Sequence, residues 1–296
     1  MPLSRLQLRT TILGLLLILT AVLGVDVFAK DGLLAAVGET QSAGLLTVVF
    51  LDVGQGDAIY IETPDGVQLL IDGGPDGSVV RALPKFMSLF DRKIDVVLAT
   101  HSDKDHIGGL TDVLERYVVE NIVRTKNTND TSVAGVFATL ESEENAAIQY
   151  AAAGQEFLLG ASTTLSILFP ASNPEGWESN SASIVAQLNY GEISFMLTGD
   201  APVGIEEYLA ESYGPLLESE VLKLGHHGSR TSTADSFLAA VDPIYAVVSA
   251  GKNNSYGHPH ESVLAKVQAQ GVDILSTASA GTVVFKSDGE KVWVEE

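Results

Sequence analysis

The sequence contains no cysteine among its 296 residues. This absence excludes disulfide bonds, cysteine-ligated zinc sites and thiol nucleophiles. Positive charge is also scarce, because 17 Lys and Arg face 38 Asp and Glu and give a formal net charge of −21. A body of this charge repels nucleic acid in bulk, so a polyanionic substrate needs a local cationic site. The acidity equally fits plain solubility in a salty or alkaline habitat.

The N-terminus has the pattern of a targeting segment. Arg5 and Arg9 precede an uncharged apolar run over residues 11–25, and Val27-Phe28-Ala29 resembles a cleavage site. The run is short for a spanning helix, although a few more residues would make it an uncleaved anchor. The arginines predict that the remainder is exported, either secreted or anchored in the membrane. The predicted parts are a signal peptide or membrane anchor over 1–29, a linker over 30–45 and a folded domain over 46–296.

Short apolar strands dominate from residue 46, and strands and helices alternate later. Strands are expected at 46–53, 58–63, 67–72, 94–100, 118–124, 164–169, 183–190, 192–198, 221–225, 244–249, 272–276 and 281–286. Helices are expected at 78–90, 108–117, 203–212, 232–240 and 260–270. The polar residues 126–163 are expected to form a variable excursion over one face. This order predicts an α/β fold in which two sheets pack face to face with helices outside.

The 6 histidines fall in three short motifs, at 101–106, 226–227 and 258–260. Each motif follows a predicted strand or lies in a glycine-rich loop, where proteins commonly display functional groups. The first motif places His101, Asp103, Asp105 and His106 within six residues, and such imidazole and carboxylate ligands suit Zn²⁺, Mn²⁺ or Fe²⁺. Asp105 could instead cap the following helix. Because the three motifs occur together, the sequence predicts a metal site.

The stretch THSDKDHIGG (100–109) resembles the signature loop of the metallo-β-lactamase superfamily. With FLDVGQGDAIYIETPDGVQLLIDGG (50–74), LTGD (197–200), LKLGHHGS (222–229) and YGHP (256–259), the chain resembles the hydrolase domain of the ComEC family of DNA-uptake proteins. The resemblance covers about residues 47–290. It implies the four-layer αββα metallo-β-lactamase sandwich. It does not imply a transport channel, because this chain has at most one candidate membrane helix and ComEC proteins have many.

The resemblance also implies roles for the motif residues. His101 and Asp103 would bind one metal ion, Asp105 and His106 a second, and Asp200 would bridge the two. His227 is favoured as the last ligand, with His226 facing the substrate, although the sequence leaves that order open. Asp200 could otherwise cap the helix at 203–212, and the histidine pair could form a pH-sensitive surface loop.

Further residues are expected around these ligands. Asp72 is predicted to orient a metal ligand, and Asp57 either does the same or only forms a turn. Asn180 and Ser183 stand where the superfamily often supplies another histidine, and they could bind a phosphate or merely cap a strand. The resulting carboxylate-rich site makes Mn²⁺ a competitor to Zn²⁺. His258 is expected to stabilise phosphoryl oxygens or protonate the leaving group, and His260 to begin a helix. The cations expected to attract phosphates are Lys223, Arg230 and Lys252.

The predicted function is a binuclear metal-dependent hydrolase, a phosphodiesterase or nuclease that uses a hydroxide activated by two metal ions, Zn or Mn. Its catalytic candidates are Asp105, His226 and His258, and single-stranded DNA is a candidate substrate. The same site could instead hydrolyse a phosphocholine ester, a cyclic nucleotide or a lactone. A non-catalytic, metal-stabilised binding domain is the third reading. Asp103 and the missing histidine argue against β-lactam hydrolysis, and no sequence feature indicates an obligate protein partner.

Overall fold

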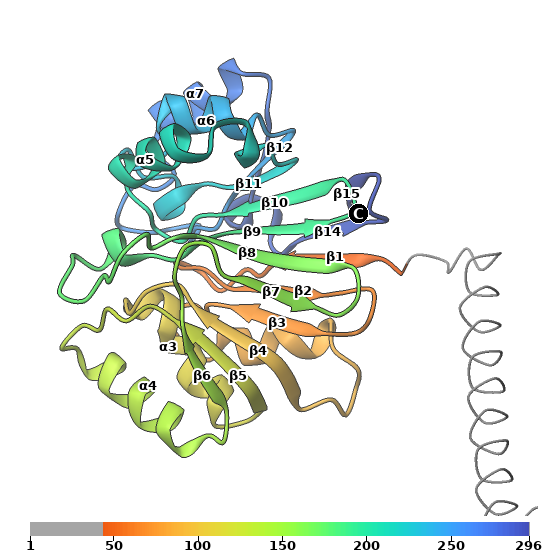
Figure 1. Cartoon of the computed structure of the whole chain (residues 1–296), viewed down its shortest axis with the longest axis vertical. Coiled ribbons are helices and arrows are strands. Elements are labelled where there is room, and N and C mark those ends of the chain that lie inside the picture. The colour runs from red at the N-terminus through yellow and green to blue at the C-terminus, as the bar shows by residue number, and fades with distance from the viewer. Residues whose placement is uncertain (1–43, 296) are drawn as a thin grey trace, which may run out of the picture. The chain divides into compact units, whose positions relative to one another are not determined.

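The structure is a computed structural model that describes residues 44–295 (Figure 1). The predicted signal peptide or anchor over 1–29 lies outside the described residues, as does most of the predicted linker. Within residues 44–295, no helix has the length and apolar character needed to cross a membrane.

The first sheet has eight strands in the order β15-β14-β1-β2-β3-β4-β5-β6. Strands β1, β2 and β3 form the expected antiparallel meander, and β3 to β6 run parallel. The strands are β1 (Leu46–Phe50), β2 (Ile59–Glu62), β3 (Gln68–Ile71), β4 (Lys93–Ala99), β5 (Val118–Arg124), β6 (Ala147–Tyr150), β14 (Val283–Ser287) and β15 (Val292–Val294).

The second sheet has seven strands in the order β13-β12-β11-β10-β9-β8-β7. Strands β10 to β13 run parallel, so their carboxyl ends meet at one edge of the sheet. The strands are β7 (Glu156–Leu159), β8 (Thr163–Phe169), β9 (Val185–Tyr190), β10 (Ile193–Leu197), β11 (Val221–Lys223), β12 (Tyr245–Val248) and β13 (Asp273–Ser276).

Helices cover the outer face of each sheet (Figure 1). Helices α2 (Ser78–Ala82), α3 (Lys104–Leu114) and α4 (Ser132–Glu143) pack on the first sheet, and α5 (Val203–Tyr213), α6 (Asp235–Val241) and α7 (Glu261–Ala269) pack on the second. A short helix α8 (Thr277–Ala280) follows β13, and single 3-10 turns are η1 (Leu83–Lys85), η2 (Asn180–Ala182), η3 (Gly214–Leu217) and η4 (Gly225–Gly228).

Three apolar layers hold these four layers together. Between the sheets, the Phe285 ring contacts Phe50 and Phe195 edge to face, with centroids 5.9 and 6.0 Å apart. Leu110 of α3 lies in the layer under the first sheet, and Phe237 of α6 lies in the layer over the second. Burying apolar faces on both sides of both sheets requires this arrangement. The predicted αββα sandwich is therefore confirmed.

Two expectations about local structure are wrong. The helix expected at 78–90 ends at Lys85, after α2 and η1. Residues 126–163 do not form an excursion. Strand β6 is the edge strand of the first sheet, which α4 covers, and β7 is an edge strand of the second sheet. All four residues of β6 are exposed. An exposed edge strand carries no alternation of buried and exposed residues, so its sequence lacks the usual strand signal.

Candidate metal centre

The histidine motifs meet at one end of the sandwich, where strands from both sheets finish. His101 follows β4 of the first sheet, and Asp200 and His227 follow β10 and β11 of the second. The loop after β12 brings His258 to the same place, where it lines a cleft with residues of the other motifs. The parallel strands of each sheet therefore deliver segments that lie far apart in the sequence to one site.

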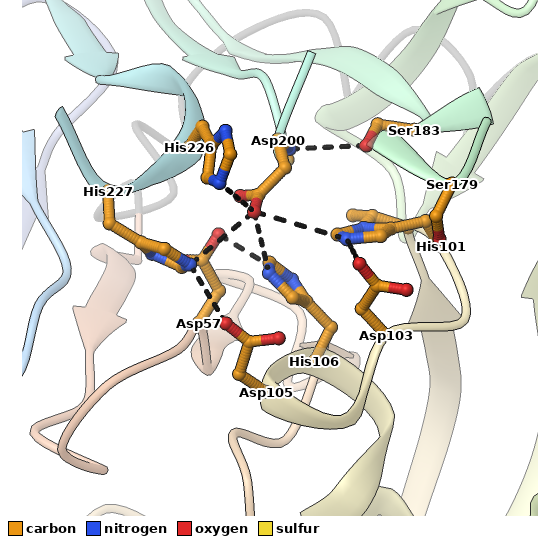
Figure 2. A network of polar contacts seen from close by, with 12 residues as sticks. Asp57, His101, Asp103, Asp105, His106, Ser179, Ser183, Asp200, His226 and His227 are labelled. Carbon is orange, nitrogen blue, oxygen red and sulfur yellow. Dashed lines mark hydrogen bonds and ion pairs between the residues drawn. The ribbon is translucent and has the colours of Figure 1, made fainter. Parts of the chain in front are cut away.

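The carboxylate of Asp200 lies at the centre of this site (Figure 2). Its Oδ2 atom is 3.3 Å from His106 Nε2, 3.4 Å from His227 Nε2, 3.9 Å from His226 Nε2 and 4.0 Å from His101 Nε2. Helix α5 has Pro202 at its N-cap position, so Asp200 does not cap it. One oxygen is therefore approached by histidines from two segments that lie far apart in the sequence.

Asp105, His106 and His227 form the tighter of two clusters beside Asp200. His227 Nε2 is 3.3 Å from Asp105 Oδ2 and 3.4 Å from Asp200 Oδ2. Tetrahedral coordination with bonds of about 2.0–2.1 Å places ligand atoms about 3.4 Å apart. The spacing of this cluster thus fits one divalent ion. Asp105 lies inside the first turn of α3, which begins at Lys104, so it is not the helix cap.

His101, His106 and Asp200 form a second group of possible ligands, and Asp103 extends this wider cluster beside His101. His101 Nε2 is 3.7 Å from Asp103 Oδ2. Asn129 fixes this carboxylate, because its Nδ2 donates to Asp103 Oδ1 at 2.8 Å and also lies 2.9 Å from Ser179 Oγ. The wide spacing leaves room for a non-protein ligand, as a catalytic metal position requires.

Hydrogen bonds at Nδ1 leave the opposite ring nitrogens of three histidines free. Asp72 Oδ2 accepts from Thr100 Oγ1 and lies 2.7 Å from His106 Nδ1, which must therefore carry the proton. Thr100 Oγ1 in turn accepts from His101 Nδ1 at 3.0 Å, and Ser249 O accepts from His227 Nδ1 at 2.9 Å. The three Nε2 atoms are buried without hydrogen-bond partners. Ring nitrogens held in this way are typical of metal ligands.

Lys223 and Asp57 form a buried ion pair behind the ligands. The Lys223 ammonium is fully buried, contacts Asp57 Oδ2, donates to Gly199 O at 2.7 Å and lies 3.6 Å from Asp200 Oδ1. Burial alone would lower the pKa of Lys223, but Asp57 and Asp200 raise it above its usual value. The expectation that Lys223 attracts substrate phosphates is therefore wrong. Because Lys223 already neutralises Asp57, this carboxylate supports the site and is a poor candidate for a ligand.

The site holds more negative than positive charge. Burial opposes protonation of His227, yet Asp200 and the nearby carboxylates of Asp105 and Asp57 raise its pKa to about 9. Burial likewise opposes protonation of His106, and Asp200 and Asp72 raise its pKa well above the usual value. In the metal-free protein these protons compensate for the carboxylates. A divalent cation would displace them, as ligand binding to a metal requires.

The loop that carries His226 and His227 has an unusual backbone. Both residues have positive φ, 47° and 56°, between Gly225 and Gly228. A Cβ on Gly225 would lie 3.1 Å from Glu206 Oε1, so this glycine permits the close approach of α5 to the loop. Strained backbone of this kind persists only where the surroundings enforce it, and here it turns both imidazoles toward Asp200.

Glu206 is a buried carboxyl group that supports this loop from behind, since its Oε2 accepts from Ala234 N at 2.6 Å. Burial raises its pKa from 4.5 to about 7. The folded protein therefore holds the proton more tightly than the unfolded chain. The resulting stability is fully present below pH 4.5 and is lost as the pH rises through about 7.

We expect the metal-free wild type to lose about 3 kcal/mol of unfolding free energy from this group between pH 5 and pH 8. Glu206→Gln keeps an acceptor for Ala234 N and removes the titration. Urea unfolding of both proteins in chelator, at several pH values, checks this. An identical pH dependence in the two proteins would contradict the assignment.

The remaining expected site residues divide between the cleft and its supports. Asn180 and His258 line the cleft, and each has a buried side-chain atom without a hydrogen-bond partner. Ser183 is buried and accepts from Asp200 N at 3.2 Å, so it supports Asp200 and is not positioned to bind substrate. Arg230 is exposed and does not line the cleft. His260 begins α7, where its side chain accepts from Ser262 N, as expected.

Four residues at the site were not among the sequence-based candidates. Thr100 links Asp72 to His101, Asn129 holds Asp103, Gln55 connects the first loop to Gly251 N at 3.2 Å, and Tyr256 lines the cleft. Thr100 is the first residue of the signature stretch 100–109 and could have been found from that position. The other three lie on loops whose proximity depends on the packing of the two sheets.

Comparisons with known proteins agree with this architecture. The sequence model described as the metallo-beta-lactamase superfamily matches residues 51–137. The chain is 30% identical over 256 residues to ComE operon protein 3 of Bacillus subtilis and 32% identical over 251 residues to competence protein ComA of Neisseria gonorrhoeae. The alignments cover 81% and 84% of this chain but 33% of each relative, so the chain spans about a third of their length.

A solved structure supports the fold independently of close sequence similarity. The metallo-beta-lactamase fold protein YhfI from Bacillus subtilis is 12% identical, with a TM-score of 0.56 over 82% of this chain and 99% of that one. The resemblance to the ComEC family, first noted from the motifs, is confirmed by the competence relatives. The shared fold and the matched signature loop place this chain in the metallo-β-lactamase superfamily.

Proposed function

We propose that this superfamily member is a phosphodiesterase that uses two divalent metal ions, Zn²⁺ or Mn²⁺. The observation that carries the proposal is the sharing of Asp200 Oδ2 between two ligand clusters at an open cleft. A carboxylate oxygen placed between two such clusters is suited to bridge two ions. Pairs of ions at bridging carboxylates are typical of enzymes that cleave phosphate esters.

The ligand sets follow from the two clusters. His101, Asp103 and Asp200 would hold one ion, and Asp105, His106, His227 and Asp200 would hold the other. Two bound cations supply Lewis-acid chemistry, because they lower the pKa of water and stabilise charge on the attacking and leaving oxygens. Asp72 keeps His106 in the correct tautomer and orientation for this role.

Three side chains on the cleft are placed to act on the substrate. Burial is the main cause that lowers the pKa of His258, and the neighbouring His226 lowers it further. The ring is therefore neutral near pH 7 and can donate one N–H to a phosphoryl or leaving oxygen. Asn180, in the turn before β9, offers its side-chain amide to the cleft. His226 is the partly exposed member of the histidine pair. These groups would orient the phosphate and stabilise the developing charge.

Single-stranded DNA, DNA ends or small phosphodiesters are the substrates that suit this acidic protein. The net charge of −21 opposes the long electrostatic contact that duplex DNA needs. Attraction to the metal centre is local, and Arg230 and Lys252, both exposed, are the nearby cations in the sequence. The names of two relatives contain the words competence or ComE, which agrees with a nucleic-acid substrate.

Export through residues 1–29, with membrane attachment if they are uncleaved, remains part of the proposal.

The experiment that tests this function compares metal-loaded wild type with Asp105→Asn. We expect the wild type to cleave bis-p-nitrophenyl phosphate and single-stranded DNA with Zn²⁺ or Mn²⁺. The variant should lose about a thousandfold in kcat, because it removes one charged ligand of the tighter cluster. Circular dichroism serves as the folding control. Hydrolysis of a carboxylic ester or lactone, dependent on Asp105 and without any phosphodiester cleavage, would contradict the phosphodiesterase and leave the hydrolase intact.

A further inference from the structure

Tyr256 is an exposed aromatic side chain at the edge of the metal cleft. It is 70% exposed, and together with His258 and Asn180 it lines the cleft that contains Asp200. An exposed aromatic ring by itself is unremarkable here, since Phe90 is 90% exposed in a loop outside this cleft. Tyr256 differs because, among the described residues that line the cleft, it is the one that offers a large aromatic face other than a histidine.

Asn254 braces the loop that carries Tyr256. Asn254 Oδ1 accepts from Tyr256 N at 3.1 Å and from His258 N at 3.0 Å, and its Nδ2 donates to Gly251 O at 2.8 Å. The Tyr256 ring lies nearly parallel to that of His258, with centroids 5.9 Å apart and 23° between the planes. The backbone that carries Tyr256 is thus held in place, and its ring lies beside His258, which lines the same cleft.

The chemistry of the cleft indicates what this ring binds. The bottom of the cleft is polar and suits a phosphate, whereas Tyr256 at the edge offers an apolar face to the group attached to that phosphate. A planar base stacks on such a face without regard to its sequence. An acidic protein gains little from the phosphate backbone, so stacking is a suitable source of affinity for a nucleotide.

We propose that Tyr256 is a stacking platform for the nucleobase next to the scissile phosphate, which makes nucleotide phosphodiesters the preferred substrate class. This inference rests on the proposed phosphodiesterase activity and extends it. Removing one base–aromatic stack should cost about tenfold in binding. The effect should fall on KM for substrates that carry a base and leave base-free phosphodiesters unchanged.

The test is a double-mutant cycle in which each enzyme variant is assayed on each substrate variant. The substrates are the dinucleotide TpT and its analogues in which a tetrahydrofuran abasic residue replaces the first, the second or both nucleosides. The enzymes are metal-loaded wild type, Tyr256→Ala, Tyr256→Leu, Tyr256→Phe and the control Tyr208→Ala, which removes an exposed tyrosine outside the cleft lining. Leucine keeps apolar contact with His258 and removes the aromatic face.

We expect the wild type, Tyr256→Phe and Tyr208→Ala to prefer TpT over the fully abasic analogue by about tenfold in kcat/KM. Tyr256→Ala and Tyr256→Leu should lose this preference through a higher KM for TpT. An equal loss on both substrates would show that Tyr256 only positions His258 and would overturn the proposal. A base preference that survives in Tyr256→Ala would overturn it as well.

A binding measurement separates this inference from the proposed function. Calorimetry on metal-loaded protein should show that dTMP binds about tenfold more tightly than methyl phosphate in the wild type and equally in Tyr256→Ala. Cleavage of phosphodiesters without this difference would reject the stacking role alone. Absence of all phosphodiester cleavage would reject the proposed activity, while the dTMP comparison would still decide whether Tyr256 binds a base.

Discussion

Replacing Asp200 with asparagine should abolish hydrolysis and release at least one metal ion per chain. Asp200 Oδ2 lies within 3.3 to 4.0 Å of four histidine nitrogens from two motifs. An amide oxygen carries no full negative charge and cannot balance two cations. We expect kcat to fall about a thousandfold or more, which corresponds to about 4 kcal/mol of transition-state stabilisation. The measurements are metal content by mass spectrometry and turnover of a small phosphodiester.

The control for this variant is Asp273→Asn, which changes an exposed aspartate on β13. It should retain full metal content and activity. If Asp200→Asn also kept two ions per chain and normal turnover, Asp200 would not be the bridging ligand. Because the lost charge lies beside Lys223, unfolding measurements on the same samples show whether the variant remains folded.

Lys223→Met should destabilise the metal-free protein by about 3–5 kcal/mol, because it leaves buried carboxylates without their partner. Lys223 is fully buried and contacts Asp57, and its ammonium is 3.6 Å from Asp200. Burial alone would raise the pKa of Asp57. The charge of Lys223, together with His227, outweighs burial and holds this pKa well below its usual range. Both charges are therefore present in the folded protein at neutral pH.

Denaturant unfolding in chelator measures this loss, with Lys252→Met as the exposed control. The loss should be smaller in metal-loaded protein, because bound cations again compensate Asp200. A loss below about 0.5 kcal/mol, the range of ordinary surface substitutions, would contradict the central role of this ion pair.

The sequence predicted which histidines and aspartates meet at one site better than it predicted their surroundings. His101, Asp105 and His106 lie within six residues of one another. Their side chains can therefore meet through local chain geometry, which the spacing in the sequence reveals. Asp72 was expected to orient a ligand, and it lies 2.7 Å from His106 Nδ1. In both cases the signal is a polar residue at the end of a recognisable strand. The fold class followed from the same strand pattern.

The errors arose where contacts join distant segments. Lys223 ends a three-residue strand with the appearance of a surface cation, and its burial depends on Asp57 from the other sheet. The sequence also left the order of His226 and His227 open, because their orientation depends on a positive-φ turn that no periodicity predicts. The edge strands β6 and β7 were missed because edge strands expose most of their residues, so apolar alternation is weak.

We propose that Asp200 would bridge two metal ions in this cleft. Anomalous diffraction from crystals of the protein loaded with Zn²⁺ or Mn²⁺ tests it most directly. We expect two peaks on either side of Asp200 Oδ2, one near His101 and Asp103 and the other near Asp105, His106 and His227. A single peak, or peaks that leave Asp200 uncoordinated, would contradict it.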